Sequence, residues 1–184
     1  REVNVYCELF PWDAPQEKIL SINPKGFILS GGPKSVYEEN APFIQKFILE
    51  SGLPILGICY GMQALTHALG GKVDPSAQRE YGHAEITPLV PGTMLDVLSK
   101  VWMSHGDKVT QLPEGFMALA KSGNSPFAAM GDMKRKYFGV QFHPEVHHTP
   151  NGTELIKHFA IDICGVTPDW TPANIIEESV KRIR

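Results

Sequence analysis

The order of apolar and polar residues predicts alternating strands and helices in the first 70 residues. Two short apolar runs, Lys25–Ser30 and Leu53–Ile58, have the length of buried strands and lead into glycine-containing turns. Helical spacing of apolar residues follows in Ala41–Ser51 and again in Tyr60–Leu69. Strands alternating with helices and joined by short links indicate a parallel sheet covered by helices.

The middle of the chain predicts a different kind of strand pairing. Short alternating or apolar segments separated by proline and glycine are typical of antiparallel strands. We expect such strands at Ala84–Leu89, Met94–Leu95, Val101–Met103, Phe116–Ser122, Phe127–Met130 and Lys134–Phe142. The predicted fold is therefore a three-layer α/β domain whose mostly parallel sheet has a small antiparallel portion.

Two helices are expected after the last strand. Thr153–Cys164 carries apolar residues on one face, and an extended connector follows it. Ala173–Arg184 is amphipathic, and Thr171 is suited to cap its N-terminus. We expect one domain over residues 1–165, and a linker with a helix over 166–184 that leads to, or packs against, a partner.

Composition narrows the function classes. The chain has 184 residues, enough for one domain with a sizeable core, and 42% of them are hydrophobic. No apolar run approaches the roughly 20 residues that cross a bilayer, and the N-terminus has no signal-peptide organisation. Net charge is −3, and the one tight basic cluster, Lys134-Arg135-Lys136, fits a hairpin tip. We expect a cytoplasmic protein without nucleic-acid or membrane partners.

The three cysteines have different surroundings. Cys7, Cys59 and Cys164 form no disulfide framework and no metal-binding spacing, which favours a reducing compartment. Cys7 and Cys164 lie in apolar surroundings and are predicted to be small core residues. Cys59 lies instead between Gly57 and Gly61, at the junction of a predicted strand and a predicted helix.

The G-x-C-x-G stretch has the form of a nucleophile elbow, in which a sharp strand-to-helix turn exposes the reactive side chain. Gly57 and Gly61 would then avoid collisions across the turn. A thiol at a helix N-terminus is favoured as thiolate, and the N–H of Tyr60 would face a developing oxyanion. A structural turn holding an inert Cys59 is the alternative from this stretch alone.

A thiol nucleophile needs a base and a group that orients the base. His143 and Glu145 follow a predicted strand and are two residues apart, so their side chains point to the same side. His147 and His148 make a metal site conceivable, but no HExxH-type pattern is present and we expect none. After the strand at Lys25–Ser30, the glycines of SGGPKS allow close approach to a ligand, and Gly32 could donate a second oxyanion N–H.

Three stretches in this order, SGGP, GICYGMQ and GVQFHPE, resemble the class I (triad-type) glutamine amidotransferase family, whose fold is flavodoxin-like. The resemblance covers nearly the whole chain. Within the family, REYGHAEI, WMSHGDKV, HPEVHHT and the W-T-P tail are most similar to the amidotransferase domains of GMP synthases.

The resemblance implies a glutaminase with a Cys59, His143 and Glu145 triad and an oxyanion hole formed by Gly32 and Tyr60. It also implies that four residues hold the glutamine substrate. These are Gln63, Ser104, His105 and Gly106. The ammonia would pass to an ATP-pyrophosphatase (synthetase) domain that aminates XMP to GMP. No cofactor is expected in this domain; ATP and Mg²⁺ would act in the synthetase domain, and a homodimer would form through that domain.

Two departures from the family pattern lead to expectations. The usual first strand and helix are absent, so Arg1-Glu2 would end that helix and Asn4–Leu9 would form the second strand. We therefore expect an N-terminally incomplete domain. Two other functions stay open: a catalytically idle amidotransferase-like binding or regulatory module, and a γ-glutamyl peptide hydrolase of the same fold.

Overall fold

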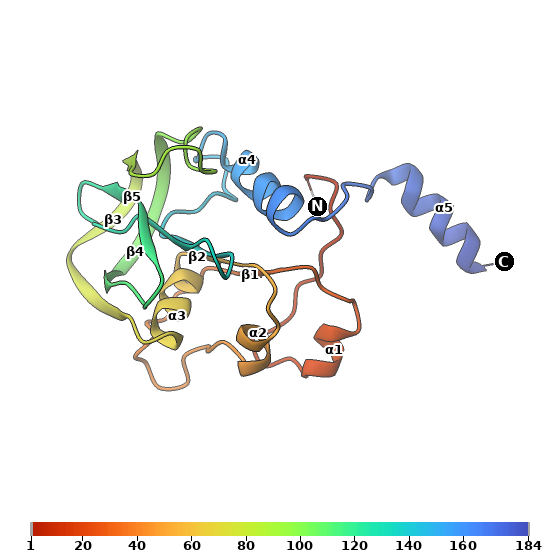
Figure 1. The fold of residues 1–184 in the computed structure, drawn as a ribbon, viewed down its shortest axis with the longest axis horizontal. Helices are drawn as coiled ribbons and strands as arrows, with labels where there is room; N and C mark the ends of the chain where they lie inside the picture. Colours follow the sequence, from red (N-terminus) through yellow and green to blue (C-terminus); the bar gives the residue numbers. More distant parts are fainter. Residues whose placement is uncertain (1, 184) are drawn as a thin grey trace.

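The computed structural model describes residues 2–183, and its strands form one seven-stranded sheet in the order β1-β2-β7-β6-β5-β3-β4 (Figure 1). The strands are β1 (Phe27–Leu29), β2 (Ile55–Ile58), β3 (Lys72–Pro88), β4 (Lys100–Gln111), β5 (Met117–Ser122), β6 (Ala129–Asp132) and β7 (Tyr137–Val140). The helices are α1 (Gln16–Leu20), α2 (Lys46–Glu50), α3 (Tyr60–Ala68), α4 (Gly152–Lys157) with its π-helical continuation η1 (His158–Ile163), and α5 (Pro172–Ile183).

The sheet has a parallel part and an antiparallel part that meet at β7. β1 pairs with β2 and β2 pairs with β7 in parallel, whereas the pairings from β7 through β6, β5 and β3 to β4 are antiparallel. The predicted α/β class is confirmed, but the antiparallel part is larger than predicted because β3 and β4 form a long two-stranded ribbon. Since carboxyl ends of parallel strands meet at one edge, the loops after β1, β2 and β7 converge there.

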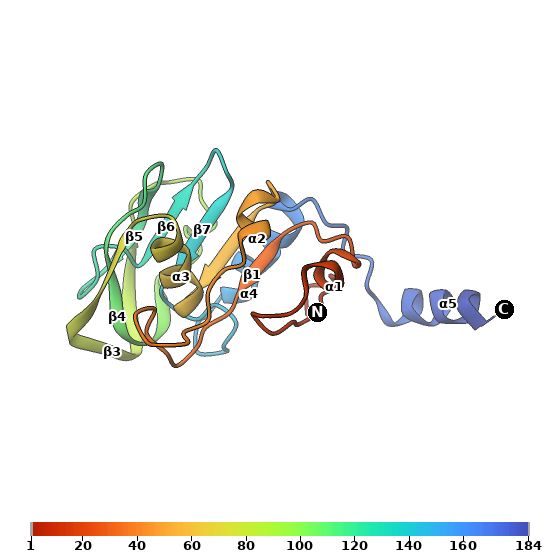
Figure 2. The ribbon, with the colours of Figure 1, turned by 90° about the horizontal axis from the view of Figure 1, so that it is seen from below.

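Helices cover both faces of the sheet, as predicted (Figure 2). α2 and α3 pack on one face, where the buried cluster includes Ile48, Ile55 and Leu65. α4 and η1 pack on the other face, where the buried cluster includes Leu155 and Phe159. Burial on both faces explains why β2 and β7 are apolar throughout rather than alternating.

The N-terminal segment differs from the prediction. Asn4–Leu9 forms no strand, and β1 is the edge of the sheet, with Ile28 at 49% exposure. A strand needs a ladder partner, and this segment instead contacts the C-terminal connector, where the Trp170 N–H donates to the Asn4 carbonyl at 2.9 Å. Cys7 is exposed, so its prediction as a core residue was wrong, whereas Cys164 is partly buried against the core.

Two predicted elements differ from the structure. The Ala41–Ser51 helix is confined to α2, because the chain before it is irregular around Pro42 and Asn40 has a positive φ of 58°. Met94 and Leu95 are buried in a turn rather than a strand. Side chains of Thr93 and Asp96 accept backbone N–H bonds in that turn and supply what a ladder would otherwise provide.

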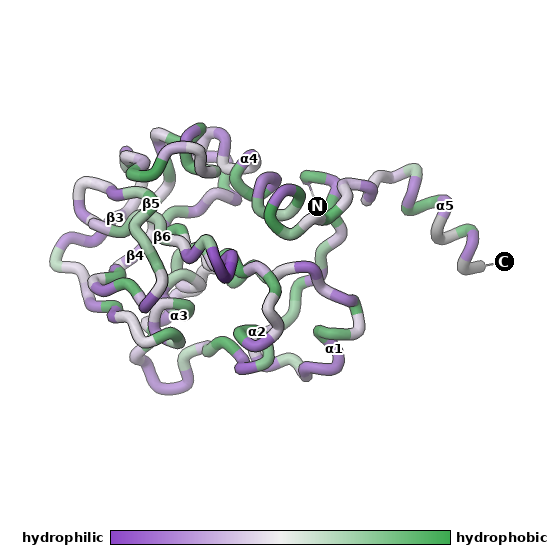
Figure 3. The backbone as a smooth tube through the Cα atoms, viewed as in Figure 1, coloured by the Kyte–Doolittle hydropathy of each residue, from purple (hydrophilic) through white to green (hydrophobic). Residues whose placement is uncertain are grey.

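α5 extends away from the body of the molecule (Figures 1 and 2). Its N-terminus is capped as predicted, with the Asn174 N–H 3.4 Å from Thr171 Oγ1. Hydrophilic and hydrophobic residues alternate along it (Figure 3), and the side chains of Ile176 and Val180 are exposed. The end of the predicted helix, Arg184, lies outside the described residues.

Candidate active site

Cys59 occupies a strained backbone position between β2 and α3. Its φ of 51° and ψ of −106° are costly for a residue with a side chain, by about 1–3 kcal/mol. The flanking glycines make this turn possible. A Cβ on Gly57 would lie 2.6 Å from the Gly61 carbonyl, and one on Gly61 would collide with the carbonyl oxygen of Leu29. The strand-to-helix turn at Cys59 is thus sharp, and its geometry requires both glycines.

His143 and Glu145 follow β7 at the same edge of the sheet. His143 Nδ1 lies 2.7 Å from Glu145 Oε1, which leaves the other ring nitrogen for Cys59. The hydrogen bond to Cys59, and then the one to Glu145, outweigh burial and raise the pKa of His143 to about 10. The site therefore favours a protonated imidazole ring beside the sulfur.

Backbone contacts hold the His143 segment in place. The His143 N–H donates to the Trp102 carbonyl of β4 at 3.0 Å, and Thr149 Oγ1 donates to the His143 carbonyl at 2.6 Å. Gly31 packs against the ring, because a Cβ there would lie 3.0 Å from His143 Cε1 and 3.7 Å from Cys59 Cβ. The loop after β1 therefore closes over the contact between sulfur and imidazole.

The two predicted oxyanion donors lie close together. Tyr60 is the first residue of α3, where helix geometry leaves its N–H without an intrahelical partner. Gly32 packs on the Tyr60 side chain, since a Cβ on Gly32 would lie 3.6 Å from Tyr60 Cγ. Within the described residues, neither N–H donates to another backbone carbonyl. Both N–H groups are thus without a backbone carbonyl acceptor, and one of them belongs to the residue that directly follows Cys59.

Buried amide side chains connect the sulfur to α3 and β4. Cys59 Sγ lies 3.6 Å from the Ser104 carbonyl and 3.7 Å from Nε2 of Gln141, which is fully buried. Gln63 Nε2 donates to the Asp107 carbonyl at 3.0 Å and to Gln141 Oε1 at 3.3 Å. Both hydrogens of the Gln63 amide nitrogen are used in this way, which fixes the orientation of this buried amide between Asp107 and Gln141.

Comparison with known proteins decides the family. The family model "Glutamine amidotransferase class-I" matches residues 1–163. Two relatives named "GMP synthase [glutamine-hydrolyzing]" match the whole chain: one from Idiomarina loihiensis at 48% identity, and one from Dehalococcoides mccartyi at 53%. The chain belongs to the class I glutamine amidotransferases. It spans 37% and 35% of the length of these two relatives.

Solved structures agree with this class I amidotransferase assignment. A protein from Thermoplasma acidophilum, named as a candidate subunit of GMP synthase, has a TM-score of 0.69 at 28% identity, over 86% of this chain and 80% of its own. A glutamine amidotransferase from Thermotoga maritima has a TM-score of 0.61 at 24% identity, over 91% and 75%. The second likeness supports the fold alone.

In this amidotransferase, the predicted substrate residue His105 has its ring in a buried network rather than at the open site. Its Nε2 lies 2.9 Å from Glu80 Oε2, and its Nδ1 lies 2.8 Å from the Asp107 carbonyl. Ser122 Oγ donates to the second oxygen of Glu80 at 2.9 Å. Burial would raise the pKa of Glu80, but the hydrogen bonds from His105 and Ser122 outweigh it and lower that pKa.

The network supports the β4 backbone that borders Cys59. Three of the predicted substrate residues lie along this border: Gln63, Ser104 and Gly106. The fourth, His105, has its ring hydrogen-bonded to Glu80 and to the Asp107 carbonyl. Sequence reasoning missed Glu80 and Gln141. Gln141 carried a signal, because it is a polar residue inside the apolar stretch that leads to His143. Glu80 follows the charged residue Arg79, and its sequence context carried no signal that it would be buried.

The histidines that follow the triad in this amidotransferase pack on aromatic rings. His147 and His148 stack at 3.9 Å between ring centroids, and His148 packs on Trp102 at 4.5 Å. Within residues 2–183, no three His, Cys, Asp or Glu side chains are grouped so that they could hold a metal ion. No helix in that range combines the length and apolar character needed to span a membrane.

Proposed function

We propose that this chain hydrolyses the side-chain amide of glutamine, with Cys59 as the nucleophile and His143, oriented by Glu145, as the proton carrier. One observation carries the proposal. A cysteine on a strained elbow and a histidine ring both lie against Gly31, and Nδ1 of that histidine is 2.7 Å from a carboxylate oxygen. That arrangement activates a thiol for attack on an amide carbonyl.

In the first half of the reaction, the Cys59 sulfur bonds to the amide carbon and the carbonyl electrons move onto oxygen. The N–H groups of Tyr60 and Gly32 stabilise that oxyanion. The oxyanion then re-forms its carbonyl, the carbon–nitrogen bond breaks, and the His143 imidazolium gives its proton to the leaving nitrogen. Ammonia departs and a γ-glutamyl thioester remains on Cys59.

In the second half, His143 takes a proton from water as the water oxygen bonds to the thioester carbon. The carbon–sulfur bond breaks, glutamate leaves, and the thiolate–imidazolium pair is restored. Glu145 keeps one ring nitrogen occupied throughout, so the other nitrogen always faces the reacting atoms.

We further propose that the ammonia serves a synthetase part which aminates XMP with ATP and Mg²⁺. The matched relatives support this, because they are named GMP synthases and are almost three times as long as this chain. In this proposal residues 1–165 are the glutaminase domain, and residues 166–184 are the linker and helix towards the synthetase part.

The test is glutamate release by Cys59→Ala, measured with and without the synthetase part, ATP and XMP. We expect release to fall to background, while ammonia-dependent GMP formation by the assembled enzyme continues. Cys7→Ala is the matched control, because Cys7 is an exposed cysteine on the N-terminal segment, and it should retain full release. Equal glutamate release by Cys59→Ala and the unmodified chain would overturn the proposal.

A further inference from the structure

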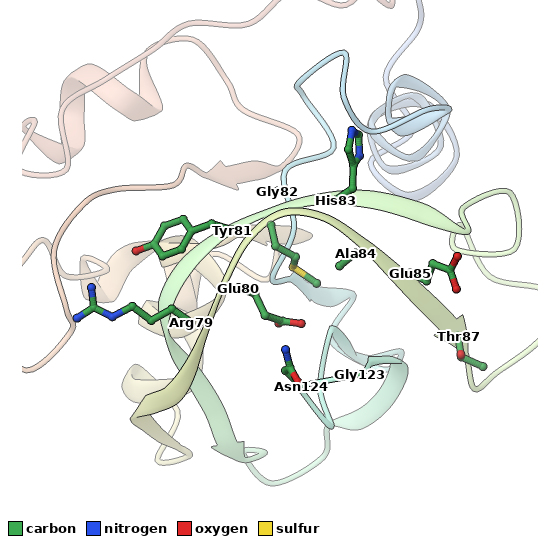
Figure 4. Close-up of a pocket in the computed structure, with 11 residues that line it drawn as sticks. Arg79, Glu80, Tyr81, Gly82, His83, Ala84, Glu85, Thr87, Gly123 and Asn124 are labelled. Carbon is green, nitrogen blue, oxygen red and sulfur yellow. The ribbon is translucent and has the colours of Figure 1, made fainter.

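The chain has an exposed cationic side chain beside the candidate site that the mechanism does not use. Arg79 lies on β3 and is exposed. In the part of the chain that the structure describes, it forms no ion pair within 4.0 Å and no side-chain hydrogen bond. Its neighbour Glu80 points to the opposite face of the strand (Figure 4). The guanidinium is therefore available to an external anion.

Strand pairing places Arg79 over the substrate-facing part of β4. Glu80 pairs with His105 and Tyr81 with Ser104, so Arg79 lies beside Gly106. A Cβ on Gly106 would be 3.7 Å from Arg79 Nε, which means that the guanidinium crosses directly above the glycine. Arg79 and Tyr81 project from the same side of the ribbon in Figure 4.

The distances match the size of a glutamine molecule. The Ser104 carbonyl is 3.6 Å from Cys59 Sγ, and Gly106 is two residues further along the same strand, about 7 Å away. In extended glutamine the amide carbon and the α-carboxylate carbon are about 5 Å apart, from bond lengths near 1.5 Å. When the side-chain amide of glutamine is at Cys59, its α-carboxylate therefore lies near Gly106 and Arg79.

We propose that Arg79 binds the α-carboxylate of the substrate and thereby selects free glutamine over amides that lack this group. The inference rests on the proposed glutaminase function. A guanidinium offers paired N–H donors that match a carboxylate. Gly106 lies directly under the Arg79 side chain, since a Cβ built there would be in van der Waals contact with Nε at 3.7 Å.

The test measures labelling of Cys59 with two reagents, followed by mass spectrometry, so it does not depend on turnover. One is a chloroketone analogue of glutamine, and the other is the same chloroketone without its α-carboxylate. In both, the Cys59 sulfur displaces chloride. The unmodified chain should react faster with the first. Arg79→Gln should slow the first reagent by about ten- to hundredfold and leave the second unchanged.

Two variants provide the controls. Lys72→Gln removes the same charge from an exposed position of β3 and should leave both rates unchanged. Arg79→Lys should keep part of the preference for the carboxylate. Equal slowing of both reagents by Arg79→Gln, or an unchanged preference, would overturn the role of Arg79 while leaving glutamine hydrolysis standing. No preference in the unmodified chain, together with no glutamate release, would overturn both proposals.

Discussion

At the scale of single residues, the charge of His143 depends on the groups that surround its ring. Hydrogen bonding to Cys59 is the largest cause of the raised pKa of His143, and the bond to Glu145 is the second. A histidine pKa of about 10, against an ordinary 6.5, means that folding favours the protonated ring. The stability linked to this proton is complete below about pH 6.5 and is lost as pH rises through about 10.

Cys59→Ala should therefore lower the pKa of His143, because the stronger of its two hydrogen-bond partners is removed. Glu145→Gln should lower that pKa by less. The measurement is an NMR titration of the His143 ring in each variant. A His143 pKa that does not move in Cys59→Ala would mean that the sulfur and the imidazole do not interact.

At this scale much of the site was predictable. Cys59, His143 and Glu145 each follow an apolar strand, and parallel strands bring their carboxyl ends together, so the sequence order alone places them at one edge. Cys7 was predicted wrongly to be a core residue, since apolar neighbours in sequence do not ensure that a side chain is buried. Glu80 could not be predicted, because its partner His105 is on another strand, at a register that the sequence does not specify.

At the scale of elements, the close approach of β2 and α3 depends on Gly57, which has no side chain. Gly57→Ala would place a Cβ 2.6 Å from the Gly61 carbonyl and the Met62 nitrogen, which belong to backbone that cannot move aside. We expect the free energy of unfolding to fall by about 2–4 kcal/mol, measured by urea denaturation.

The matched control for Gly57→Ala is Gly123→Ala. A Cβ at Gly123 meets no atom within 4 Å, and the residue has no positive φ. Its effect on the free energy of unfolding should stay within about 0.5 kcal/mol. Comparable losses in the two variants would show that the cost comes from glycine replacement in general and not from the close approach of α3.

Element prediction succeeded where burial on both faces produces an unbroken apolar run, as in β2 and β7. It failed for the part of β3 before Ala84, where Pro75 and Gly82 interrupt a strand that pairs with β4 across a register shift. It also failed at Asn4–Leu9, which has strand-like composition but does not pair with the edge strand β1. Pairing partners decide such cases, and they are set by the whole chain.

At the scale of the whole molecule, α5 is an appendage to the domain. Ile176 and Val180 are exposed, and the buried clusters on both faces of the sheet draw none of their described members from α5. Deleting residues 172–184 should change the free energy of unfolding by less than about 1 kcal/mol, which corresponds to about 2–4 °C in melting temperature. Differential scanning calorimetry of the two chains measures this. A drop of roughly 10 °C would show that α5 packs on the domain.

The parallel strands β1, β2 and β7 that bring the site together also decide when it forms. Gln141 and Cys59 are 82 residues apart in sequence. β7 can therefore pair with β2 only after the long chain between these two strands has been made. Contacts of such long range form late in folding. A chain still being made, or one that has lost the β2–β7 pairing, lacks the contact of Cys59 Sγ with Gln141 Nε2. The surroundings of Cys59 are therefore a property of the finished fold, and we expect the rate of Cys59 alkylation to differ between finished and unfinished chains.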